Sequence, residues 1–360
     1  MIDTATNIGL AAAAAAFTIA IVISVAIIVA IRPWLQRIAL AKPNARSSHS
    51  VPTAQGGGIA VVAATIIAAA GALSLSASAA SATALLLPLV VAVIVIAAVG
   101  AADDMRPIGV APRFFLQAFS VALVIFALPD ELRVAPFMPI FIERLLLTIA
   151  GLWFVNLVNF MDGLDWMTVA EVVPITAALA IFGAFGFLPA TQAIISLALC
   201  GAMIGFAYFN RPVARLFLGD VGSLPVGLLL GWLLVQLAGR GAVAAAILLP
   251  LYYLADATIT LIRRLIAGEK VWQAHRSHFY QRATDRGFAV SQVVARVFAV
   301  NIALAALALF TLAAPGLLND TAALVCGAAL VGWLLLAFSR GRGPRHSGAE
   351  PSEQPGTHNR

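Results

Sequence analysis

Four polar side chains in one short stretch are the clearest candidates for chemistry. Asn156, Asn159, Asp162 and Asp165 lie within ten residues between two apolar segments, and no Lys or Arg accompanies them. A carboxylate at the centre of a bilayer costs about 2.5–3.5 kcal/mol, so ionisable groups kept among apolar segments generally have a function. The stretch therefore predicts part of a functional site, with an acidic loop exposed to water as the alternative.

Two further acidic motifs could hold a metal ion or handle phosphate. Asp103 and Asp104 end an apolar run, and adjacent carboxylates repel each other unless a cation or a hydrogen-bond donor joins them. Asp220 is expected to begin a helix with Ser223 in its first turn, where free N–H groups suit phosphate oxygens and the carboxylate suits Mg²⁺. Gly219 would let the backbone approach a ligand closely. The alternatives are an acidic pair that ends a membrane span and an ordinary helix cap by Asp220.

A basic motif lies in the last long loop. His275, Arg276 and His278 supply three cationic donors for a diphosphate. The alternatives are a solvated basic loop beside anionic lipid and a zinc site, the latter disfavoured because no cysteine or third histidine is near. Arg46 and His49, ahead of a glycine triplet at 56–58, are weaker candidates on their own.

The composition indicates which elements must position these side chains. Of the 360 residues, 62% are hydrophobic and 11% are charged, and the mean hydropathy is +0.99. A water-soluble domain of this size would leave too much apolar surface exposed, so the sequence predicts an all-α polytopic membrane protein. Eleven transmembrane segments are expected, at 8–31, 56–74, 83–102, 113–128, 139–158, 167–187, 189–209, 222–238, 241–263, 291–314 and 319–338.

The positions of the 22 Lys and Arg residues predict an orientation. With the N-terminus outside the cell, most of them fall in cytoplasmic loops, as the positive-inside rule requires. This bias accounts for the net charge of +6 without nucleic-acid binding. The polar motifs then all face the cytoplasm, which indicates a single active site. We expect one catalytic domain at 1–340 and a disordered cytoplasmic tail at 341–360, which is rich in Gly, Pro, Ser, Glu and Arg.

The combined motifs resemble those of the polyprenyl-phosphate N-acetylhexosamine-1-phosphate transferases. The resemblance covers about residues 40–290, follows the same order along the chain and includes an early match at 43–53. Because muramyl-pentapeptide transferases carry consecutive histidines in the last loop, the sequence is more similar to the branch that starts O-antigen and related surface glycans. The matching motifs are Asp103-Asp104, Asn156-x-x-Asn159-x-x-Asp162-Gly163-x-Asp165, Phe217-Leu218-Gly219-Asp220-x-Gly222-Ser223 and His275-Arg276-Ser277-His278.

The resemblance implies a Mg²⁺-dependent phosphoglycosyltransferase of the bacterial inner membrane, with Mn²⁺ as the alternative ion. Undecaprenyl phosphate would attack the sugar-bearing phosphorus of a UDP-N-acetylhexosamine, release UMP and leave a polyprenyl-diphosphate-sugar. A homodimer is compatible with this reading. From the resemblance and the residue chemistry together we expect Asp220 and Asp162 to bind the metal. We expect catalytic roles for Asp103, Asp104, Asp162, His275, Arg276 and His278, and substrate binding by Asn156, Asn159, Arg46, His49, Gly219 and Ser223.

Two other functions stay open at this point. One is the phospho-N-acetylmuramoyl-pentapeptide transferase reaction of peptidoglycan synthesis. The other, of a different class, is ion-coupled secondary transport, because intramembrane carboxylates and glycine breaks also mark coupling-ion sites.

Overall fold

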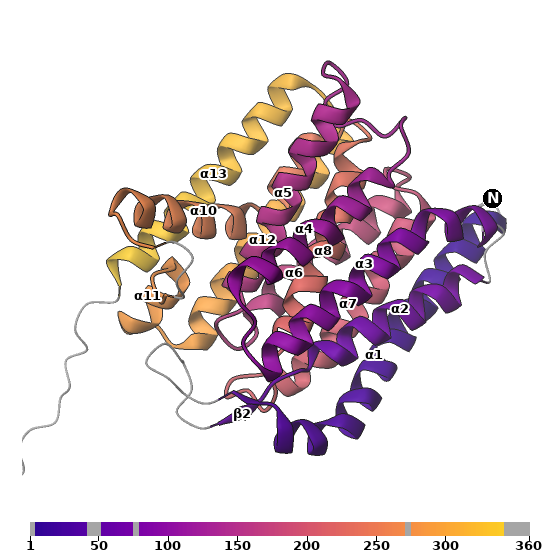
Figure 1. Ribbon diagram of the computed structural model, residues 1–360. Coiled ribbons are helices and arrows are strands. Elements are labelled where there is room, and N and C mark those ends of the chain that lie inside the picture. Colours follow the sequence, from indigo (N-terminus) through magenta and orange to yellow (C-terminus); the bar gives the residue numbers. More distant parts are fainter. Residues whose placement is uncertain (1–3, 42–51, 75–78, 271–274, 342–360) are drawn as a thin grey trace, which may run out of the picture.

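Thirteen helices and a two-stranded sheet make up the described part of the chain, which in this computed structural model comprises residues 4–41, 52–74, 79–270 and 275–341 (Figure 1). The short strands β1 (Leu40–Ala41) and β2 (Thr53–Ala54) pair antiparallel. The helices are α1 (Thr4–Ile38), α2 (Gly58–Ser74), α3 (Ala79–Met105), α4 (Val110–Phe126), α5 (Ile140–Met161), α6 (Met167–Ala184), α7 (Ala190–Asn210), α8 (Asp220–Ala238), α9 (Val243–Leu248), α10 (Leu251–Ile266), α11 (Phe279–Asp285), α12 (Val290–Ala313) and α13 (Leu317–Arg340).

The fold class expected from composition is confirmed: the protein is all-α and multi-pass. Eight of the described helices are long and apolar enough to cross a membrane, and α2 and α4 are shorter apolar helices. Large apolar side chains point outward along the bundle, where lipid would surround them, because apolar groups gain nothing from burial against protein when the solvent is hydrocarbon. Examples are Val22, Leu87, Phe115, Phe141 and Trp333.

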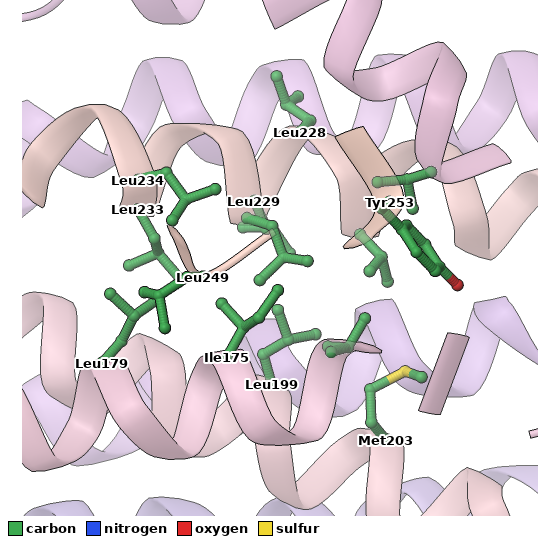
Figure 2. Packing of buried hydrophobic residues seen from close by; sticks show 14 of the residues in the cluster. Ile175, Leu179, Leu199, Met203, Leu228, Leu229, Leu233, Leu234, Leu249 and Tyr253 are labelled. Atoms are coloured by element: carbon green, nitrogen blue, oxygen red, sulfur yellow. The ribbon is translucent and has the colours of Figure 1, made fainter. Parts of the chain in front are cut away.

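Helix α8 lies at the centre of the bundle. Most of its residues are buried, and it packs against α3 and α5 and also touches α2. Small residues allow these close approaches: a side chain on Gly58 of α2 would collide with the backbone of Gly222, and one on Gly100 of α3 would collide with the backbone of Asp220. Figure 2 shows the leucines of α8 interleaved with apolar side chains of α6 and α7, and the labelled residues are Ile175, Leu179, Leu199, Met203, Leu228, Leu229, Leu233, Leu234, Leu249 and Tyr253.

The expectation of one continuous span at 241–263 is wrong. The chain breaks at Leu249–Pro250 into the six-residue α9 and the longer α10, which lies obliquely to α13 in Figure 1. Proline has no N–H to donate and its ring clashes with the preceding turn, which explains the break. Helix α10 is also amphipathic rather than uniformly apolar, with Asp256, Thr260 and Arg264 buried on one side and Leu265 and Ile266 exposed on another.

Two groups of expectations lie outside the described residues. Arg46 and His49 fall within 42–51, and nearly all of the expected tail falls within 342–360.

Candidate active site

Three helix ends meet at one end of the bundle and bring the acidic motifs together. Asp103 and Asp104 lie in the last turn of α3, Asp162 directly follows α5, and Asp220 is the first residue of α8. Helix α3 ends at Met105, two residues before Pro107, as expected of a proline that cannot continue a helix.

Asp104 holds the start of α8 in place. Its carboxylate accepts the backbone N–H of Asp220 at 3.0 Å and of Val221 at 3.1 Å. These N–H groups are therefore not free, and the expectation that they would bind phosphate is wrong. Asp220 is not the helix cap either, because Gly219 occupies that position with φ +76° and ψ 170°. A Cβ on Gly219 would lie 2.5 Å from Oδ2 of Asp104, so only glycine leaves room for this carboxylate.

Asp103 is paired with a cation that the sequence analysis did not select. Its Oδ2 accepts a hydrogen bond from Arg113 of α4 at 2.8 Å, and its Oδ1 accepts the N–H of Ile108 at 2.7 Å. The same guanidinium nitrogen lies 3.5 Å from Oδ2 of Asp220. Arg113 thus partly neutralises carboxylates from two helices. The sequence feature that could have identified Arg113 is its position shortly after the Asp pair, at the start of an apolar helix.

The amides of α5 connect the motifs further. Asn159 donates to Oδ1 of Asp220 and to Oγ of Ser223, both at 2.8 Å. Asn156, one turn earlier, donates at 2.9 Å to Gln117 of α4. The spacing of these two asparagines therefore directs one toward α8 and the other toward α4.

Asp162 and Asp165 have different surroundings despite their proximity in sequence. Asp162 accepts a hydrogen bond from Thr168, and its pKa is raised to about 8, first by desolvation and then by repulsion from Asp220, Asp104 and Asp165. Asp165 is buried and accepts the N–H of Ala214 at 3.0 Å. Asp165 thus holds the backbone at Ala214 as well as repelling Asp162, whereas Asp162 is bonded to Thr168.

The histidine motif separates into two parts. His275 and His278 stack with ring centroids 4.8 Å apart, and both line a cavity that Asp103 and Asp220 also line. Arg276 instead forms an ion pair with Asp285 at 3.0 Å and donates to Thr284 of α11. Within the described residues it is not part of the cavity wall.

This cavity has a volume of about 670 Å³ and is lined by both polar and apolar side chains. The polar ones are Asp103, Arg113, Gln117, Asn156, Asn159, Asp220, His275 and His278. The apolar ones come from α4, α5 and α10 and are Val110, Phe114, Ile149, Leu152, Trp153, Phe160 and Leu261. A ligand with an anionic head and a hydrocarbon tail matches this mixed lining.

The sequence analysis also missed the residues that hold the histidine loop. Asp256 of α10 accepts the N–H groups of Phe279 and Tyr280 at the start of α11, at 3.0 and 3.1 Å. The hydroxyl of Tyr280 donates to the carbonyl of Phe160 near the end of α5 at 3.0 Å. A side chain at Gly163 would collide with the hydroxyl group of Tyr280, so this position requires glycine. Asp256 lies inside an expected membrane span, and the only sequence feature that could have identified it is a carboxylate within an apolar segment.

The donor set suits a hard divalent cation that also binds substrate phosphates. Among the described residues no group of three or more His, Cys, Asp or Glu side chains could hold a metal ion alone. Each oxygen of Asp104 accepts one backbone N–H group, and Asp220 and Asp162 lie close enough to repel each other. Mg²⁺ commonly binds through one or two carboxylates and completes its shell with phosphate and water, which fits this pair.

Residues 86–238 match the family model for glycosyl transferase family 4. The matched segment runs from α3 to the end of α8 and contains Asp103, Asp104, Asn159, Asp162 and Asp220. Over this segment, which is less than half of the chain, the protein is similar to glycosyl transferases of that family. The histidine loop lies beyond the matched segment.

Proposed function

We propose that this protein transfers an N-acetylhexosamine-1-phosphate from its UDP derivative onto undecaprenyl phosphate. The products are UMP and a polyprenyl-diphosphate-sugar that starts a cell-surface glycan such as an O-antigen or teichoic acid. The observation that carries the proposal is the single cavity whose lining combines carboxylates, Arg113 and two histidines with apolar side chains of α4, α5 and α10. The family match on α3–α8 supports the same reaction class.

The proposed reaction requires mainly that the protein position the two phosphates relative to each other. The second pKa of an alkyl phosphate is near 6, so the lipid phosphate is largely a dianion at pH 7 and needs little help from a base. One oxygen of this phosphate attacks the sugar-bearing phosphorus, and the bond from that phosphorus to the oxygen of UMP breaks. Arg113 and the histidines would stabilise the negative charge on the two phosphates.

Mg²⁺, if bound by Asp220 and Asp162, would supply charge neutralisation between the phosphates of the donor. The chain's own part is to orient these groups: Asp104 fixes the start of α8, and Asn159 fixes the carboxylate of Asp220. The apolar side chains of the cavity, among them Phe114 and Trp153, would align the prenyl chain so that its phosphate meets the polar side chains.

The rival function of ion-coupled transport is less well supported by the geometry. A coupling site is expected near the middle of the membrane, with access from both sides. Here the carboxylates of Asp103, Asp162 and Asp220 gather where helices end, at one end of the bundle.

The test is UMP release by the purified full-length protein with undecaprenyl phosphate, Mg²⁺ and a panel of UDP-N-acetylsugars. We expect lipid-dependent UMP from one sugar, its loss with EDTA, and at least about a 100-fold lower rate for Asp220→Asn. Asp320→Asn, at the start of α13, is the matched carboxylate control and should keep the wild-type rate. Folded protein that releases no UMP from any sugar, or an Asp220→Asn variant of normal rate, contradicts the proposal.

A further inference from the structure

The two histidines of the cavity wall are held in different ways. Ser277 approaches His275, with its backbone N–H 3.4 Å and its Oγ 2.8 Å from Nδ1 of the ring. A backbone N–H can only donate, so Nδ1 of His275 is an acceptor and the ring proton lies on Nε2. His275 is therefore held as a neutral ring.

His278 has the opposite arrangement. Its Nδ1 lies 3.2 Å from Oδ1 of Asp256, which is fully buried. The backbone N–H groups of Phe279 and Tyr280, which can only donate, also bond to this carboxylate, so it serves as an acceptor in this loop. A proton on Nδ1 of His278 completes the same pattern. The other donors to Asp256 are the N–H groups of Phe279 and Tyr280 and the hydroxyls of Tyr252 and Thr260.

This contact leaves Nε2 of His278 as the free ring nitrogen. Within the described residues no protein group bonds to it, although the residue lines the cavity with Asp103, Arg113 and Asp220. A second proton on Nε2 would be stabilised by the buried carboxylate on the far side of the ring, as in the Asp–His pairs of hydrolases. The neighbouring ring of His275 is stacked at 4.8 Å, so two positive rings would repel each other.

We propose that Asp256 is a positioning residue that makes His278, and not His275, the cationic donor to the diphosphate, through Nε2. The inference rests on the proposed function and divides the roles within it. His278 touches the substrate phosphate, Asp256 acts on that phosphate through the His278 ring while also holding the start of α11, and His275 contributes a neutral N–H.

A double-mutant cycle on UMP release tests the division. We expect His278→Asn to lower kcat about 100-fold and Asp256→Asn to lower it at least about tenfold, with little change in KM. Because Asp256 acts through the ring, the double variant should be no slower than His278→Asn alone. Glu269→Gln is the matched control. Glu269 is a carboxylate just after α10 that pairs with Arg264, and its variant should keep the wild-type rate. Losses that multiply in the double variant, or Asp256→Asn within threefold of wild type, overturn the inference.

A second measurement does not depend on turnover and reads the two rings in the wild-type protein. The chain has five histidines, so ¹⁵N-histidine labelling gives few ring signals, and His275→Gln and His278→Asn assign the two of interest. We expect Nδ1 of His278 to be protonated in the wild-type protein and the proton of His275 to lie on Nε2. An unprotonated Nδ1 on His278 refutes the pairing. Wild-type protein that shows the expected ring signals but releases no UMP would instead count against the proposed function.

Discussion

Replacing Gly219 by alanine should damage the active site through two separate effects. Alanine at φ +76° and ψ 170° occupies a region that is essentially restricted to glycine, at a cost of about 1–3 kcal/mol. Its Cβ would also lie 2.5 Å from Oδ2 of Asp104, the oxygen that accepts the N–H of Val221. A displaced carboxylate loses a hydrogen bond involving a charge, worth about 1.5–3 kcal/mol. Together the effects amount to about 2.5–6 kcal/mol at the start of α8.

Since each 1.36 kcal/mol corresponds to a factor of ten, we expect Gly219→Ala to lower the rate of UMP release at least about 50-fold. Gly186→Ala is the matched control, because Gly186 also has positive φ, +82°, but a Cβ there would meet nothing within 4 Å. The control should lose some thermal stability and keep its rate. The assay is UMP release alongside thermal unfolding in detergent. Equal rates for the two variants would refute the claim that Asp104 and Gly219 together position Asp220.

Three further outcomes are expected. Arg113→Gln should slow UMP release about ten- to hundredfold, because Asp103 and Asp220 lose a charged hydrogen-bond partner, and Arg113→Lys should recover part of the rate. Because the pKa of Asp162 is raised from 3.8 to about 8, the folded metal-free protein binds this proton more tightly than the unfolded chain. Its thermal stability should therefore fall as pH rises from 6 to 8, while Mg²⁺ affinity, measured by calorimetry, should rise up to about tenfold per pH unit and level off above 8. A pH-independent affinity would contradict this. Trp153→Ala should raise the KM for the lipid and leave the KM for the UDP-sugar nearly unchanged, since Trp153 is a large apolar side chain of the cavity wall.

Local patterns predicted much of the architecture. Long apolar runs mark membrane helices because every backbone group in lipid must be paired within the helix, so hydropathy alone located most of the described helices. The end of α3 at Asp103-Asp104 and the start of α8 at Asp220 also followed from the sequence, because proline, glycine and charge change the chain's local preferences there. The expected span at 241–263 failed because hydropathy averages over Pro250 and over the polar side of α10.

The long-range contacts that organise the site could not be predicted from local sequence patterns. Asp104 bonds to the start of α8, which lies more than a hundred residues later in the sequence. Asp256 bonds to the start of α11, which lies 23 residues later. Sequence spacing within one motif carries no information about such pairs. The opposite ring protons inferred for His275 and His278 depend on which neighbour each Nδ1 meets, and this is a property of the folded loop.

The burial of α8 also bears on how the chain is assembled during synthesis. Its two largest partners, α3 and α5, precede it together with α2, and among its main partners in the described chain only α9 follows, so most of its contact surface has already been synthesised when α8 emerges from the ribosome. A helix that begins with Asp220 and contains Gln236 can then enter a protein-lined space rather than bare lipid. Chains truncated after Gly239 should therefore already protect α8 from lipid-soluble labels, whereas the histidine loop can join the site only after α10 has been made.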